Sequence, residues 1–149
     1  HSPLYRAMRD AVERIEAFFT ALTPADVARM GAFYTADVTF KDQFNEVRGL
    51  PEVQRIFTHM YEALDNPRFV ITGRVVDGAQ CFLVWEFRFA FRNFHKGVEQ
   101  VVRGGSHLQL APDGRIASHR DYWDAAEELY EKLPLVGGLM RWLKRRANG

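Results

Sequence analysis

The chain has 149 residues, the size of one ordinary domain, and it can bury a core without disulfides or a structural metal. Its 20 basic and 19 acidic residues nearly balance, which argues against nucleic-acid binding, since such proteins usually carry a basic face. Cys81 is the only cysteine, so no disulfide forms within the chain, and we expect a buried, inert thiol. Because no apolar run is long enough for a membrane helix and no signal peptide is visible, we expect a cytoplasmic protein.

Helical signals occupy most of the first 64 residues. Apolar residues recur at spacings of three and four, which places them on one stripe of each helix. Threonine, proline and aspartate within Thr23–Asp26 are typical of a helix start, and Asp-Asn-Pro at 65–67 is typical of a helix end. The predicted helices are Tyr5–Leu22, Pro24 to about Tyr34, and Leu50–Leu64, with a short strand, Val38–Phe40, before the third.

The apolar spacing changes to two after residue 68, which is the period of a half-buried strand. In the longest such segment large apolar residues alternate with mostly polar ones, so we expect one face to be buried: Leu83, Trp85, Phe87, Phe89 and Phe91. The predicted strands are Phe69–Val76, Gln80–Arg92, Val98–Leu110 and Arg115–Trp123. Gly104 and Gly105 predict a bulge that bends the third of them.

These elements predict one α+β domain over residues 1–149, with a strongly bent antiparallel sheet and the helices packed on one of its faces. The core is expected over about 8–124, followed by a helical tail over about 125–147 with segments at Asp124–Leu133 and Leu135–Arg146. The last segment is amphipathic and basic. It could touch an anionic membrane surface, although a docked terminal helix is the simpler interpretation.

The order of the elements from about Val12 to Trp123 resembles the nuclear transport factor 2-like superfamily, in its SnoaL-like and ketosteroid isomerase-like branch. The residues that carry the resemblance are Phe33-Tyr34-Thr35-Ala36-Asp37-Val38-Thr39-Phe40-Lys41-Asp42, Arg48-Gly49, Pro112-Asp113-Gly114-Arg115-Ile116 and Tyr122-Trp123. The resemblance implies a cystatin-like cone, in which a strongly curved antiparallel sheet and three N-terminal helices enclose an apolar pocket. It leaves the function open, because this superfamily hosts isomerases, cyclases, hydrolases, dehydratases and binding modules.

The resemblance also implies roles for particular residues. Asp42 falls where ketosteroid isomerases keep the aspartate that shuttles a proton, and Trp123 where they keep a pocket tryptophan. Their two oxyanion donors, a tyrosine and a protonated aspartate, are replaced here by Phe18 (or its neighbour Phe19) and by Ser106. Losing one such donor typically lowers a rate by roughly 10²–10³-fold, so we do not expect a proficient ketosteroid isomerase.

Asp121 falls near the acidic base of SnoaL-type polyketide cyclases, and on a strand it shares a face with His119. His119 could therefore assist Asp121 as a general base, or be a satisfied polar group in a pocket wall. Asp121 could also pair with an arginine such as Arg103, and Asp42 could cap the loop 43–46. The Asp-Arg-Asp set of the superfamily's epoxide hydrolases cannot be located in the sequence.

The candidate catalytic residues are therefore Asp42, Asp121 and His119, and the candidate pocket or ligand-binding residues are Phe18, Tyr34, Phe57, Trp85, Phe87, Ser106 and Trp123. Tyr34 could donate a hydrogen bond into the pocket or simply pack its ring. No glycine-rich phosphate loop and no close set of His, Cys or carboxylates is present, so we expect no cofactor and no metal.

Two functions fit these observations. The first is an enzyme that binds a small, largely apolar molecule, carbonyl-containing or polyketide- or steroid-like, and transfers a proton as an isomerase, cyclase or dehydratase. The second is a ligand-binding or dimeric scaffold module without catalysis. In either case the resemblance implies a homodimer formed through the outer sheet face, where Glu86 and Arg88 are expected. The sequence does not name the substrate or the reaction.

Overall fold

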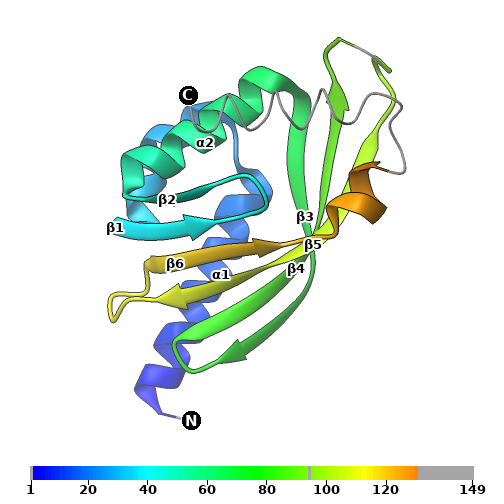
Figure 1. Cartoon of the computed structure of the whole chain (residues 1–149). Helices are drawn as coiled ribbons and strands as arrows, with labels where there is room; N and C mark the ends of the chain where they lie inside the picture. The colour runs from blue at the N-terminus through cyan, green and yellow to red at the C-terminus, as the bar shows by residue number, and fades with distance from the viewer. Residues whose placement is uncertain (1, 94, 131–149) are drawn as a thin grey trace.

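One strongly curved sheet of six strands dominates the computed structural model, which describes residues 2–93 and 95–130 (Figure 1). The strands follow the order β2-β1-β6-β5-β4-β3 across the sheet. Their bounds are β1 Tyr34–Lys41, β2 Glu46–Arg48, β3 Leu64–Asp77, β4 Gln80–Phe91, β5 Gln100–Leu110 and β6 Ile116–Tyr122. Every neighbouring pair is antiparallel except β1 and β6, which are parallel. The prediction of an all-antiparallel sheet is therefore wrong at this pair. The two strands lie about 80 residues apart in the sequence, and no local sequence pattern indicates whether such a pair is parallel or antiparallel.

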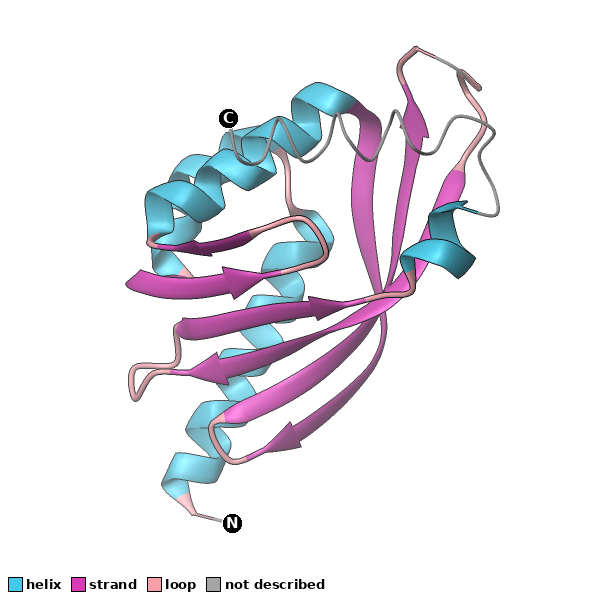
Figure 2. Cartoon of the chain, viewed as in Figure 1, coloured by secondary structure: helices cyan, strands magenta, loops and turns pink. Residues whose placement is uncertain are grey.

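The three predicted helices are confirmed, with shifted bounds. They are α1 Pro3–Ala21, the 3₁₀ helix η1 Pro24–Ala32 and α2 Leu50–Ala63. A capping box starts η1, in which the Asp26 carboxylate accepts a hydrogen bond from the Thr23 backbone N–H at 2.9 Å. In Figure 1, α1 runs behind β6, β5 and β4, and Figure 2 shows α2 lying alongside β1 and β2 at the other end of the molecule.

Strand β3 begins at Leu64, directly after α2, and not at Phe69 as predicted. Pro67 lies inside it, although proline lacks the N–H that a central strand needs. Two features make room for this residue: β3 is an edge strand, and its pairing with β4 shifts register between Asp65 and Arg68.

The alternation of β4 is confirmed, since Leu83, Trp85, Phe89 and Phe91 are buried and Phe87 is half-buried. Gly104 and Gly105 do not form the predicted bulge, because β4 and β5 pair without a register shift across both. A Cβ on Gly104 would lie 2.7 Å from the Trp85 ring, and one on Gly105 would overlap the Phe82 ring. The two glycines therefore leave room for aromatic rings of the neighbouring strand β4.

The chain continues past β6 into a short π-helix, η2, at Ala126–Tyr130. The Asp124 carboxylate accepts hydrogen bonds from the first backbone N–H groups of this turn. The Glu128 carboxylate accepts hydrogen bonds from the Arg103 backbone N–H at 3.0 Å and from its Nε at 2.6 Å, so it occupies the edge of β5 where β6 has ended. The remainder of the predicted segment Asp124–Leu133 and the basic segment Leu135–Arg146 lie outside the described residues. None of the helices described here is both long and apolar enough to cross a membrane.

Candidate functional site

Strand register brings polar side chains from three strands together on the helix-covered face of the sheet. Ser106 on β5 is paired with Asp121 on β6. On the other side of β6, Lys41 is paired with Arg120 in the parallel β1–β6 ladder. Asp42 directly follows β1, and its carboxyl is close enough to Asp121 for the charge of Asp121 to raise its pKa. Two predicted catalytic carboxylates are therefore neighbours across adjacent strands.

A continuous chain of hydrogen bonds runs through the buried side of this face. The indole Nε1–H of Trp85 donates to Ser106 Oγ at 2.8 Å, and the Ser106 hydroxyl donates to Asp121 Oδ1 at 2.5 Å. His119 Nε2 is 2.6 Å from the same Asp121 oxygen. Its other ring nitrogen, Nδ1, is 2.7 Å from the hydroxyl of Tyr34. Five of the predicted site residues are thus joined in one network.

The direction of each hydrogen bond follows from the donors at the two ends. The Trp85 indole can only donate. Tyr34 is fully buried, and its burial, followed by the negative charge of Asp121, raises the pKa of the phenol well above its usual value. The Tyr34 hydroxyl has no other partner among the described residues, so it donates to His119 Nδ1, and the ring hydrogen of His119 lies on Nε2. That hydrogen and the Ser106 hydroxyl both point at Asp121 Oδ1, which accepts both hydrogen bonds.

The two oxygens of Asp121 differ in their surroundings. Oδ1 receives hydrogen bonds from Ser106 and His119, whereas Oδ2 receives none from any residue in 2–93 or 95–130. The Asp121 side chain keeps 19% of its surface exposed, compared with 5% for His119. Arg103, the arginine considered as a partner for Asp121, instead pairs with Glu128. Asp121 therefore keeps one oxygen without a donor from the described residues, on a side chain that is partly exposed.

Asp42 is held by its own loop, as the capping interpretation predicts. Its Oδ1 accepts hydrogen bonds from the backbone N–H of Phe44 at 2.8 Å and of Asn45 at 2.7 Å, and from Asn45 Nδ2 at 3.0 Å. Burial raises the pKa of this carboxyl, and the charge of Asp121 raises it further, against the opposing effect of the hydrogen bonds. Asp42 therefore holds its own loop in place and is also a neighbour of Asp121.

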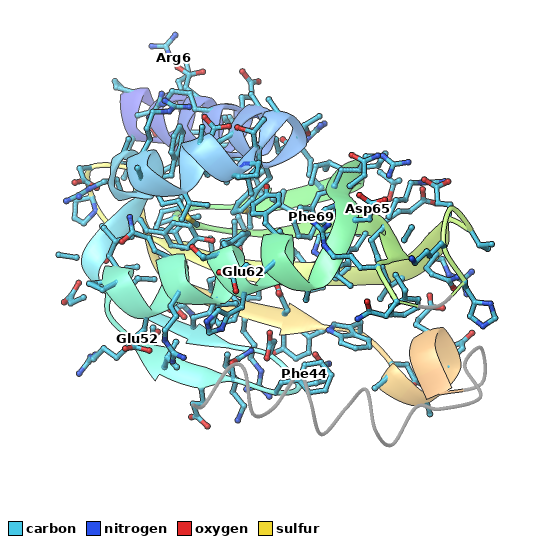
Figure 3. All side chains as sticks on the ribbon, turned by 90° about the horizontal axis from the view of Figure 1, so that it is seen from above. Arg6, Phe44, Glu52, Glu62, Asp65 and Phe69 are labelled. Carbon is cyan, nitrogen blue, oxygen red and sulfur yellow. The ribbon has the colours of Figure 1, made fainter. Side chains whose placement is uncertain are left out.

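The aromatic candidates divide into those at the polar network and those away from it. Tyr34 and Trp85 belong to the network, and Trp123, two residues after Asp121, has its ring centroid 5.6 Å from that of Phe44. The remaining three pack on other apolar side chains: Phe18 on Phe33, Phe57 on Phe19 and Phe87 on Phe69. Figure 3 shows Phe44 and Phe69 on opposite sides of α2.

Three residues at the site were missing from the candidates. Phe19, named only as the alternative to Phe18, is the one whose ring meets His119 edge-on at 6.1 Å, and Phe40 lies 4.7 Å from the same ring. Asn45 is 7% exposed and donates to Asp42. Its position three residues after an aspartate is a local signal of such a loop, and the two phenylalanines are identified only by the fold. No three His, Cys, Asp or Glu side chains within the described ranges are grouped closely enough to hold a metal ion.

Solved structures with the same arrangement of helices and strands share little sequence with this chain. A protein of ketosteroid isomerase-like fold from Catenulispora acidiphila DSM 44928, in complex with trimethylamine, is 18% identical with a TM-score of 0.67, covering 80% of this chain and 89% of its own. An LEH-like epoxide hydrolase of M. tuberculosis is 19% identical with a TM-score of 0.69, covering 90% and 96%. A protein named as a SnoaL-like polyketide cyclase from Jannaschia sp. CCS1 is 15% identical with a TM-score of 0.70, covering 85% and 92%. These likenesses show the fold, which is ketosteroid isomerase-like.

The family is shown by sequence. No curated protein matches the chain, but the family model of the SnoaL-like domain matches residues 15–119, which is more than half of its length. The match includes Asp42, Ser106 and His119 and ends two residues before Asp121. The expected resemblance is therefore confirmed, and the chain belongs to the family of SnoaL-like domains.

Proposed function

We propose that this protein binds a small, largely apolar molecule with a carbonyl group on the helix-covered face of its sheet, and that Asp121 transfers a proton on that molecule. The observation that carries the proposal is the asymmetry of the Asp121 carboxylate. Its Oδ1 is fixed by Ser106 and His119, and its Oδ2 has no donor in the described residues. A carboxylate held by one oxygen and open at the other is arranged as a general base.

In the proposed reaction, Asp121 Oδ2 removes a proton from a carbon next to the carbonyl group and returns it at a second position. This is the proton movement of an isomerase, cyclase or dehydratase. His119 and Ser106 hold Asp121 in one orientation, and Tyr34 fixes the tautomer of His119 from behind. Asp42, which lies beside Asp121, is the second candidate base.

The described residues supply little stabilisation for a developing oxyanion. Phe18 has no donor and its ring is stacked on Phe33 with centroids 4.0 Å apart. The Ser106 hydroxyl hydrogen is engaged by Asp121 and cannot polarise a ligand carbonyl at the same time. We therefore propose a reaction of an already acidic C–H group, for which a weak oxyanion site suffices.

The names of two structural neighbours support an enzymatic function. One is called an epoxide hydrolase and another a SnoaL-like polyketide cyclase, and both act on small organic molecules by name. A further neighbour of the same fold was crystallised with polyporic acid. These names support small-molecule chemistry on this fold, and the residues that would perform it here are those of the network around Asp121.

Proton exchange on a simple ketone tests the proposal. We expect the wild-type protein to accelerate the exchange of the acidic C–H protons of 2-tetralone in D₂O, followed by NMR. Asp121→Asn should lower the acceleration by roughly 10²–10⁴-fold, the usual contribution of a general base. Asp37→Asn, which changes an exposed aspartate of β1, is the matched control and should retain it. Exchange that survives both Asp121→Asn and Asp42→Asn would contradict the assignment.

The second candidate function is a ligand-binding module without catalysis. It is favoured by the missing oxyanion donors, because Phe18 and Ser106 give no free hydrogen to a carbonyl. In this case the polar network is structural. Replacement of Asp121 would then lower the free energy of unfolding, and the wild-type protein would bind apolar ligands without accelerating proton exchange.

We also propose that two copies associate through the outer face of the sheet. Val84 and Tyr122 are exposed there, at 42% and 44%, which is unusual for large apolar residues on a sheet. The Arg88 guanidinium pairs with Glu86 at 2.8 Å beside them. An apolar centre with a charged border is the usual composition of a protein–protein interface.

A further inference from the structure

Asp42 and Asp121 form a pair of neighbouring carboxylates that neither a lysine nor an arginine of the described residues pairs with. We infer that the molecule bound at this site carries a positively charged nitrogen, as a protonated or quaternary amine, which lies against these two side chains. The inference names the substrate class of the proposed function and rests on it. Three observations support it: the missing counter-charge, an unpaired acceptor beside the pair, and aromatic rings at its edge.

The first observation is the missing counter-charge. Like charges on neighbouring strands destabilise a sheet, and here Asp42 directly follows β1 while Asp121 lies on the adjacent β6. Asp42 forms no ion pair within residues 2–93 and 95–130, and the only ion-pair partner of Asp121 there is His119.

The cationic side chains on the neighbouring strands are already engaged elsewhere. Lys41 pairs with Glu46 at 3.5 Å, and Arg103 pairs with Glu128 at 2.6 Å. The Arg120 guanidinium lies over the Tyr122 ring, 4.9 Å from its centroid. Lys41 and Arg120 immediately precede the two carboxylates along the chain, so they point to the opposite face of the sheet.

The second observation is an unpaired acceptor. Asn45 is more than nine-tenths buried, and its Nδ2 donates to both oxygens of Asp42, at 3.0 and 3.2 Å. The planar amide therefore lies against the Asp42 carboxylate. Its Oδ1 is buried without any hydrogen-bond partner. With Asp121 Oδ2, this makes two acceptors that have no donor among the described residues, one on each side chain that neighbours Asp42. An ammonium group supplies N–H donors and a positive charge together, whereas a neutral carbonyl supplies neither.

The third observation is the aromatic border. Trp123 follows Asp121 by two residues and Phe44 follows Asp42 by two, and the rings of Trp123 and Phe44 contact each other. Both are half-buried, which leaves part of their surface open. Aromatic faces attract cations, and tryptophan does so most strongly. Carboxylates next to such rings are suited to an alkylammonium group whose carbon chain continues along apolar surface.

The charge also fits the proposed chemistry. A positive nitrogen near a carbonyl withdraws electrons from the adjacent C–H bond and makes its proton more acidic. The same group would thus be recognised by Asp42 and would assist removal of a proton by Asp121. This removes the need for the oxyanion donors that the described residues lack.

Three probes with one apolar body and different head groups test the inference on the wild-type protein. They are 4-phenylbutylamine, which is a cation at neutral pH, 4-phenyl-1-butanol, which is neutral, and 4-phenylbutyrate, which is an anion. Isothermal titration calorimetry at low salt measures each dissociation constant. We expect the amine to bind at least about tenfold more tightly than the alcohol and the anion to bind most weakly, since hydrogen bonds to charged groups are the stronger ones.

Variants show whether the carboxylates are responsible. Asp42→Asn and Asp121→Asn should each raise the dissociation constant of the amine by about tenfold and leave that of the alcohol unchanged. Asp37→Asn should change neither dissociation constant. Equal or tighter binding of the alcohol by the wild-type protein overturns the inference and leaves the proposed apolar site intact. Failure of all three probes to bind overturns both. The comparison of the three probes uses only the wild-type protein, so it still decides the inference if one of the variants does not fold.

Discussion

Replacing Tyr34 by phenylalanine removes one hydroxyl from the buried network and keeps the ring. The Tyr34 ring lies parallel to the His119 ring, with an interplanar angle of 2°, and meets Phe19 edge-on at 6.3 Å. These packing contacts survive the change. What is lost is the donor to His119 Nδ1, an atom of a side chain that is 4% exposed. Water is unable to replace the donor there without a local rearrangement.

The expected cost follows from the acceptor that remains. A buried acceptor without a donor typically costs about 1–3 kcal/mol, and removing the hydroxyl's own desolvation offsets part of this. We therefore expect Tyr34→Phe to lower the free energy of unfolding by about 1–2 kcal/mol. In a domain of this size, each kcal/mol corresponds to roughly 2–4 °C in Tm, so the melting temperature should fall by about 2–8 °C.

Urea denaturation followed by circular dichroism measures this change, with the slope of the transition checked for two-state behaviour. Tyr122→Phe is the matched control, because Tyr122 is 44% exposed on the outer face. Its effect should stay within about 0.5 kcal/mol. If Tyr34→Phe were no more destabilising than Tyr122→Phe, the hydroxyl would not be completing the network, and the assigned tautomer of His119 would lose its basis.

Two further predictions concern pH and assembly. Burial raises the pKa of Asp42 above its unfolded value of 3.8, so the stabilisation linked to its protonated form is complete below that value and is lost as the pH rises through the folded pKa. The free energy of unfolding of the wild-type protein relative to Asp42→Asn should therefore decrease with rising pH in this window, and an increase would contradict the shift. Light scattering should give a dimer mass for the wild-type protein and a monomer mass for Val84→Glu, because Val84 lies exposed in the proposed interface. A wild-type mass of one chain at all concentrations would contradict that assembly.

Local patterns predicted much of this fold. The alternation in β4 gives a buried row of aromatic residues because side chains on a strand point to opposite faces in turn. The same alternation places His119 and Asp121 on one face, and the structure confirms it, with His119 Nε2 2.6 Å from Asp121 Oδ1. The loop after Asp42 follows from the short range over which an aspartate side chain reaches backbone N–H groups.

Contacts between distant segments were not predictable in this way. Tyr34 reaches His119 across 85 residues, and Trp85 reaches Ser106 across 21. Both contacts depend on strand register, which the sequence patterns leave open. The glycine pair illustrates the same difficulty. Two adjacent glycines predict a bulge because glycine adopts backbone conformations that other residues avoid. In the fold, Gly104 and Gly105 instead leave space for the rings of Trp85 and Phe82 on neighbouring β4.

The carboxylate of Glu128 has a consequence for how this chain behaves among its own copies. Where β6 stops at Tyr122, the backbone of β5 would present an open N–H group at Arg103 to any extended segment nearby. An open strand edge of this kind is a template for adding a foreign strand and for aggregation. Glu128 accepts that N–H and also binds the Arg103 side chain, so one side chain from a single helical turn closes the position. The Glu128 carboxylate thereby blocks the addition of a foreign strand at the position of β5 that β6 does not cover.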